Sequence, residues 1–196
     1  IHNWHDKKLT EIRKDNGLTV DEKPELNGLH FIQIDEFYPI DPNQHNSLYN
    51  YDMNYYIDGF GLNAENGLFM NCDEIPRTLG KNLEDIFPDK RVDLSLRYRE
   101  PHGALEEEQK KTIYLVDQWC SEYENKIHEM GGIGFFLGGI GPDGHIAFNI
   151  RGSDHNSTTR LMETNFETQA AAATDLGGIE ISSNRLVITI GLSTIK

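Results

Sequence analysis

Short apolar runs, separated by polar stretches, set the pattern of this chain. Four of them are uninterrupted or nearly so: LHFIQI (29–34), GLFM (67–70), IGFFLGGI (133–140) and RLVITI (185–190). The first follows an Asn-Gly turn signal, and each is short enough to be a strand. We therefore expect four strands, and we expect residues 133–140 to be buried.

A long helix is predicted between two of these strands, over residues 104–130. Its apolar residues recur at spacings near three and four, namely Leu105, Ile113, Val116, Trp119, Tyr123, Ile127 and Met130. Acidic residues occupy its first turn, and Gly131-Gly132 follows it as a stop signal. Residues 45–60 are aromatic and compatible with a second helix, with Asn46 or Ser47 as its N-cap. Residues 76–103 are expected to be irregular.

Strands that are apolar throughout and separated by helices favour an α/β fold, with a parallel sheet covered by flanking helices. Such sheets bind ligands at the carboxyl ends of their strands. The sequence DEF (35–37) follows the first strand, and GPDGH (141–145) follows the third. The pattern therefore predicts that these two segments converge on one pocket, which favours an enzyme.

Composition narrows the choice of partners. The chain has 196 residues, of which 37% are hydrophobic and 26% charged, and its net charge is −14. This charge argues against a nucleic-acid partner, and no apolar run approaches the length of a membrane span. Cys72 and Cys120 lack CxxC spacing, which favours reduced thiols and a cytoplasmic location. Because the chain opens on what resembles the tail of a helix and stops after a strand, we expect residues 1–196 to be one domain that is incomplete at both ends.

The glycine-rich segment from Gly138 to His145 carries the clearest candidate chemistry. Glycines allow a sharp turn and the close approach of a ligand, and free backbone N–H groups there can hold an anion or a sugar hydroxyl. A histidine such as His145 can transfer protons, and Asp143 is placed to orient its ring. The alternative is a structural turn in which the histidine serves as a hydrogen-bonding strut.

Asp35 and Glu36 form the second candidate pair. A carboxylate at the end of a buried strand is partly desolvated, which raises its pKa and suits a general base. The alternative is a solvated loop acid, or the N-cap of the following turn. No metal site is expected, since His2 and His5 have the spacing of two ligands but no third ligand nearby.

The residues GGIGPDGHIAFN (138–149) resemble the signature of the glucosamine-6-phosphate deaminases, also called isomerases, and IQIDEFYPI (32–40) resembles the other active-site segment of that family. The segment GPDGH is also similar to the related 6-phosphogluconolactonases, but the continuation IAFN is that of the deaminases. The resemblance extends from about Leu29 to Ile195. It implies a Rossmann-like parallel sheet with flanking helices.

The resemblance also implies a reaction in amino sugar metabolism. The enzyme would be an aldose–ketose isomerase and deaminase, classed as a hydrolase, that opens the ring of an amino-sugar phosphate, moves a proton from C2 to C1 and releases ammonia. It would need no cofactor and no metal. Asp35 would be the base, and His145 would open the ring with support from Asp143. The expected substrate contacts are Glu36, Gly138, Gly139, Gly141 and Gly144. The expected partner is a small sugar phosphate, with no nucleic acid and no membrane, and a homo-oligomer is left open.

This sequence departs from the family pattern at several positions. Ile150 stands where the deaminases carry a relay glutamate, and isoleucine cannot transfer a proton. Thr174 and Met162 stand where the family has an arginine and a lysine that bind phosphate. Weakened or altered deaminase activity is therefore one expectation, with Arg151, Asp154 or His155 as a replacement relay. A lactonase-like hydrolase and a non-catalytic sugar-phosphate-binding regulatory domain are the alternatives.

Overall fold

The computed structural model describes residues 7–19, 26, 28–78, 80–176, 178 and 185–196. The helices are α1 (Lys7–Asp15), α2 (Leu48–Asp52), α3 (Leu83–Ile86), α4 (Ala104–Glu129), α5 (Phe166–Leu176) and α7 (Leu192–Ile195), with a π-helical turn η2 (Met53–Asp58) and the 3₁₀ turns η3 (Ala64–Asn66) and η4 (Leu94–Arg97). The strands are β1 (Phe31–Ile32), β2 (Asp35–Tyr38), β3 (Gly67–Leu68), β4 (Arg160–Glu163) and β5 (Leu186–Thr189). His2 and His5 lie outside the described residues.

The α/β class with flanking helices is confirmed, and one pair of strands is parallel. β1 pairs in parallel with β3, while β2, β5 and β4 form a second sheet in that order. This second sheet is antiparallel, which differs from the expected parallel sheet, and Asp35 begins β2 instead of following the end of a strand. An apolar run favours a buried strand, but it carries no information on the direction of the neighbouring strand.

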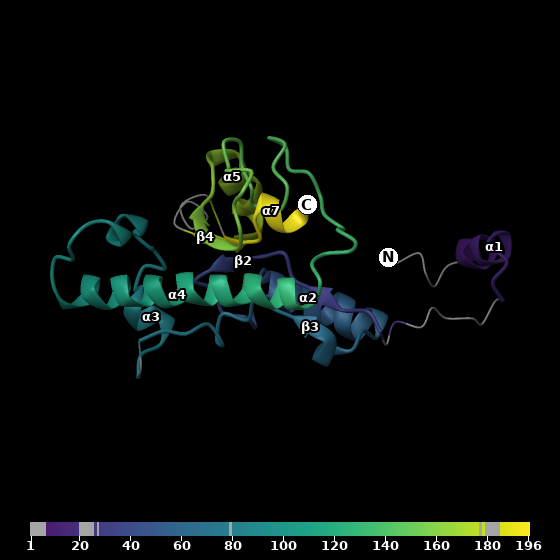
Figure 1. Cartoon of the computed structure of the whole chain (residues 1–196), viewed down its shortest axis with the longest axis horizontal. Helices are drawn as coiled ribbons and strands as arrows, with labels where there is room; N and C mark the ends of the chain where they lie inside the picture. Colours follow the sequence, from purple (N-terminus) through teal and green to yellow (C-terminus); the bar gives the residue numbers. More distant parts are fainter. Residues whose placement is uncertain (1–6, 20–25, 27, 79, 177, 179–184) are drawn as a thin grey trace.

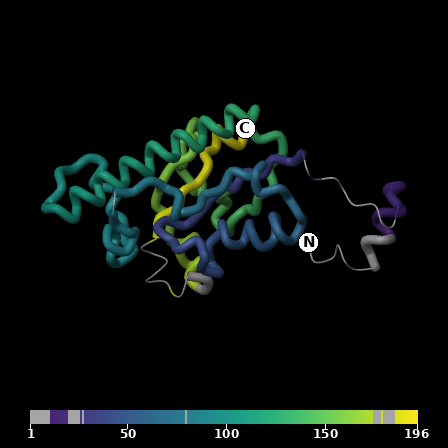
Figure 2. The backbone as a smooth tube through the Cα atoms, turned by 90° about the horizontal axis from the view of Figure 1, so that it is seen from below, coloured from purple at the N-terminus to yellow at the C-terminus, as the bar shows by residue number. Residues whose placement is uncertain are grey.

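Helix α4 is the longest helix among the described residues, and other elements pack along it. In Figure 1 it lies between β4, α5 and α7 on one side and α3 and β3 on the other. Its apolar stripe enters the core through Ile113, Val116, Tyr123 and Ile127, all of which are buried. In Figure 2 the C-terminal residues lie beside α4, whereas α1 stands apart from the rest of the molecule in both views. The long helix predicted over residues 104–130 is confirmed.

Residues 133–140 do not form the predicted buried strand. They have no regular secondary structure apart from an isolated bridge between Ile140 and Ile146. Phe135, Leu137 and Ile140 are 82%, 68% and 75% exposed. The apolar run suits a strand, but no neighbouring strand of the described chain lies along it to complete the pairing. No helix among the described residues is long and apolar enough to span a membrane.

Candidate active site

The strand that carries Asp35 places two acidic side chains on opposite faces of the antiparallel sheet. Because successive side chains alternate along a strand, Asp35 and Phe37 share one face and Glu36 lies on the other. Asp35 is opposite Thr189 in the neighbouring strand, and Thr189 is opposite Arg160 in the next. Directly opposite residues lie on the same face about 5 Å apart. Asp35, Thr189 and Arg160 therefore form one row across the sheet.

The residues that follow the glycine-rich segment contact this same face. The backbone N–H of Phe148 donates to Oγ1 of Thr189 at 3.1 Å, and Arg160 donates to Oδ1 of Asn149 at 2.9 Å. The rings of Phe148 and Phe37 are 5.4 Å apart, and the His145 ring stacks on Phe148 at 6.1 Å. Asp35 and His145 are thus on one face of the sheet, linked through Thr189 and Phe148.

Asp143 and His145 form a hydrogen-bonded pair. Nδ1 of His145 lies 2.5 Å from Oδ1 of Asp143, and both side chains are largely buried. The other carboxylate oxygen of Asp143 accepts a bond from Asn165 at 2.6 Å. That bond first, and the one with His145 second, lower the pKa of Asp143 and keep it ionised. Oγ1 of Thr168, at the start of α5, lies 3.4 Å from Nδ1 of His145. A carboxylate that fixes an imidazole in this way suits proton transfer.

The glycines of this segment differ in what they do. A Cβ on Gly141 would lie 1.9 Å from Cε1 of His145, so only glycine lets the ring pack there. Gly144 has φ +85°, a left-handed conformation that favours glycine. A Cβ on Gly138 would meet the ring of Phe136, whereas one on Gly139 would meet nothing. Gly138 and Gly139 are exposed.

Asp35 borders a cavity of about 760 Å³ between residues 28–35, the helical turns 48–56 and residues 132–137. Burial first, then the charges of Glu36 and Asp52, raises the pKa of Asp35 to about 8. Asp52 borders the same cavity, and burial followed by Glu36 raises its pKa to about 7. Two carboxyl groups that titrate near neutral pH in one cavity suit general acid–base chemistry. His145 lies on the same face of the sheet but does not border this cavity.

Glu36 has a different environment. Its side chain is fully buried and accepts bonds from the N–H groups of Phe37, Leu48 and Tyr49 and from the hydroxyl of Ser47. Ser47 is the N-cap of α2, as the sequence allowed. Because four donors occupy its two oxygens, this geometry favours a helix-capping role for Glu36 over the predicted contact with substrate.

Ile150 is partly buried five residues after His145. It borders a hollow of about 520 Å³ together with residues 151–154, residues 156–158, Arg160 and Met162. Arg151, Asp154 and His155 are exposed, and no hydrogen bond or ion pair joins any of them to His145 within the described chain. The structure therefore brings none of these candidate replacement groups to the imidazole.

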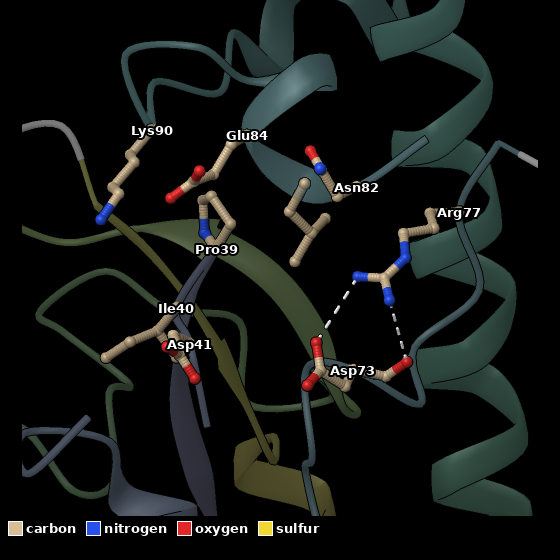
Figure 3. Close-up of a pocket in the computed structure, with 9 residues that line it drawn as sticks. Pro39, Ile40, Asp41, Asp73, Arg77, Asn82, Glu84 and Lys90 are labelled. Carbon is tan, nitrogen blue, oxygen red and sulfur yellow. Dashed lines mark hydrogen bonds and ion pairs between the residues drawn. The ribbon is translucent and has the colours of Figure 1, made fainter. Parts of the chain in front are cut away.

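A further hollow of about 210 Å³ lies at the other end of β2 (Figure 3). Arg77 faces Asp73 there, with an ion pair of 3.7 Å and a bond of 3.3 Å to its carbonyl oxygen. Lys90 and Glu84 lie across the hollow from this pair. It contains none of the residues predicted for catalysis. Among the described residues, no group of three His, Cys, Asp or Glu side chains is arranged to hold a metal ion.

Sequence reasoning missed Asp52, Asn165 and Thr168. Asp52 lies in an aromatic helical stretch without a motif, and the other two reach Asp143 and His145 only because α5 packs beside the glycine-rich segment. Nothing in the local sequence around these three residues signals a contact so distant along the chain.

Comparison with known proteins confirms the resemblance over part of the chain. It is 49% identical over 76 residues to a glucosamine-6-phosphate deaminase of Caenorhabditis elegans, which is 39% of this chain and 28% of the relative. It is 42% identical over 80 residues to a glucosamine-6-phosphate isomerase of Candida albicans, and this match covers 41% of this chain and 32% of the relative. It is 46% identical over 76 residues to glucosamine-6-phosphate deaminase 2 of Homo sapiens, and this match covers 39% of this chain and 28% of the relative. The matched part thus spans about a third of the length of these relatives.

A solved structure is similar over nearly the whole chain. It is a monomeric glucosamine-6-phosphate deaminase of the NagB superfamily, with a TM-score of 0.60 and 20% sequence identity over 96% of this chain and 59% of that one. This likeness shows a shared fold. No protein-family profile matches the chain.

Proposed function

We propose that this chain carries the acid–base site of a glucosamine-6-phosphate deaminase, with Asp35 as the base and the Asp143–His145 pair as the ring-opening group. The observation that carries the proposal is the position of Asp35. It borders a sugar-sized cavity, has a pKa near 8, and lies on the sheet face that the residues following His145 contact. The curated relatives at 42–49% identity over part of the chain support the substrate class.

The chemistry divides between the two groups. His145, oriented by ionised Asp143, takes the proton of the sugar's C1 hydroxyl and returns one to the ring oxygen, which opens the ring. Asp35 then removes the C2 proton and delivers it to C1, while one proton of the amine passes to O1, so that C2 becomes an imine carbon beside a C1 hydroxymethyl group. Water adds to this imine and ammonia leaves, giving the ketose phosphate. A base with a pKa near the working pH both accepts and returns this proton efficiently.

Ile150 favours a second candidate function. Because no acidic side chain of the described chain replaces the missing relay glutamate beside His145, ring opening would be slow. A sugar-phosphate-binding regulatory domain would need the cavity and not the relay. A lactonase would need only a water activated by His145.

The test is ammonia release from glucosamine 6-phosphate, with binding measured by calorimetry in parallel. We expect turnover, and we expect Asp35→Asn to lower kcat by about 10²–10⁴-fold, the usual worth of a general base. Asp58→Asn, which changes an exposed acid of η2, is the matched control and should leave kcat unchanged.

The other outcomes separate the alternatives. Tight binding without product would favour the regulatory domain, and hydrolysis of 6-phosphogluconolactone alone would favour the lactonase. Neither binding nor turnover of glucosamine 6-phosphate would refute the proposal. A large gain of deaminase rate in Ile150→Glu would show that the relay is the only missing part.

A further inference from the structure

Arg185 is a buried cation with unused hydrogen-bond donors. It stands immediately before β5 and is only 3% exposed. Its Nε and Nη1 atoms are buried and have no hydrogen-bond partner within the described chain. Buried polar groups are normally paired, and a buried guanidinium without an acceptor is strongly unfavourable. Such a group marks a place where an acceptor from outside the chain would be stabilising.

The side chain borders a polar cavity of about 310 Å³ between β4, β5, α5 and the segment before η4. The cavity is also lined by Arg91, Thr164 and Gln169, and the Gln169 amide, which has two N–H donors, uses one of them for the carbonyl oxygen of Thr164 at 3.0 Å. Two acids are among the described residues that border the cavity, and one of them, Asp93, is already paired with Arg99 at 2.8 Å and accepts from the N–H of Ser95.

The second acid, Glu163, is exposed at the end of β4 and makes no ion pair with either arginine. Two guanidinium groups, a hydroxyl and a side-chain amide therefore surround a space that their own acids do not neutralise. Arginine is the side chain best suited to such a space, because its fork of donors matches the oxygens of a phosphate or carboxylate.

This cavity lies at the other end of the sheet from Asp35. β2 and β5 run antiparallel, so Asp35 is opposite Thr189 at one end, whereas Leu186 is opposite Tyr38 at the other. Arg185 is four residues before Thr189, roughly 13 Å along an extended chain. The two places are nevertheless connected, because Thr164 directly precedes Asn165, the donor to Asp143.

We propose that the cavity around Arg185 is a binding site for a compact oxyanion, namely inorganic phosphate or the phosphoryl group of a small monoester. The guanidinium of Arg185 holds two oxygens of the anion from inside the cavity. Arg91, which is exposed, closes over it from the surface, and Thr164 and Gln169 complete the donor set. The site lies at the opposite end of the sheet from Asp35 and does not depend on deaminase activity.

The test measures the affinity of the protein for inorganic phosphate and for glycerol 3-phosphate by calorimetry, with chloride at matched ionic strength as the blank. We expect saturable binding of at least one anion. Arg185→Met should weaken that binding at least tenfold, and which of the two anions binds tighter identifies the source of the phosphoryl group. Arg151→Gln, which changes an exposed arginine elsewhere, should bind as the unchanged protein does.

Two further measurements keep the test decisive. Without added anion, Arg185→Met should keep or raise the thermal midpoint of unfolding, because it replaces an unpaired buried charge with an apolar side chain of similar volume. If this variant fails to fold, Arg91→Gln at the exposed rim replaces it and should also weaken binding. No saturable binding of either anion, or equal binding by the unchanged protein and the folded variants, would overturn the proposal.

Discussion

Gly141 shows how closely the backbone approaches the histidine that we assign to ring opening. A Cβ at this position would lie 1.9 Å from the ring of His145, whereas a Cβ on Gly139 would have nothing within 4 Å. We predict that Gly141→Ala displaces the ring and lowers kcat by about 10²-fold, as small misplacements of catalytic groups do. Ile140→Ala, which changes an exposed side chain at the preceding residue, is the matched control and should retain kcat. Equal activities in the deaminase assay would contradict the assigned role of His145.

Asp35 should make the protein less stable as pH rises. Its pKa is about 8 in the folded state and 3.8 in its ordinary environment, so between these values the folded protein holds a proton that the unfolded chain has lost. Stability contributed by this proton is complete below about pH 4 and is lost as pH rises through 8.

Asp35→Asn removes this dependence. We therefore predict that the variant gains stability over the unchanged protein as pH rises from 5 to 9, by up to ~1.4 kcal/mol for each pH unit within the window. Urea unfolding at a series of pH values measures the difference, with Asp58→Asn as the exposed control. Parallel curves for Asp35→Asn and the unchanged protein would show that the carboxyl group is ionised at neutral pH.

The candidate site could be predicted where its chemistry lies within a short stretch of sequence. Asp143 and His145 are two residues apart, and the structure joins them directly. Asp35 follows an apolar run, and its pKa is raised by burial as the sequence led us to expect. The function of Glu36 could not be predicted from the sequence. Asp35 and Glu36 are adjacent, and the sequence does not show which of the two side chains faces the cavity and which caps α2.

At the scale of elements, local signals were sufficient for α4 but not for the segment before the glycine-rich turn. The α4 pattern includes its own stop signal and its own buried stripe. Residues 133–140 contain only apolar side chains and glycine, and such a run becomes a strand only when a neighbour supplies hydrogen bonds. β4, with the sequence RLME, was missed for the converse reason, because its pairing with β5 and not its own composition makes it a strand.

This difference predicts a contrast in backbone protection. Residues 133–140 lack the ladder of bonds that a strand has in the described structure, so their amides should exchange with solvent within seconds. Residues 113–127 of α4 are helical and packed in the core, and their amides should exchange orders of magnitude more slowly. Hydrogen exchange followed by mass spectrometry compares the two peptides. Strong protection of residues 133–140 would mean that another strand pairs with them in solution.

At the scale of the whole molecule, one buried carboxylate accepts hydrogen bonds from segments that are distant along the chain. Glu124 on α4 is 5% exposed and accepts bonds from the N–H and hydroxyl of Thr159, before β4, and from the hydroxyl of Thr194 on α7. Helix α4 could be predicted from the sequence, but its attachment to these segments could not, because Thr159 and Thr194 are 35 and 70 residues away along the chain.

The hydrogen bonds of Glu124 should contribute measurably to the free energy of unfolding. Glu124→Ala leaves two buried threonine hydroxyls and one N–H without their acceptor, so we predict a loss of about 2–4 kcal/mol in the free energy of unfolding. Glu122→Ala, an exposed change two residues earlier on the same helix, controls for helix propensity and net charge and should stay within about 0.5 kcal/mol of the unchanged protein. Urea unfolding of the three proteins at one pH measures both. Equal losses of unfolding free energy in the two variants would mean that the hydrogen bonds of Glu124 to Thr159 and Thr194 contribute nothing. Helix α4 would then be held in place by its apolar stripe alone.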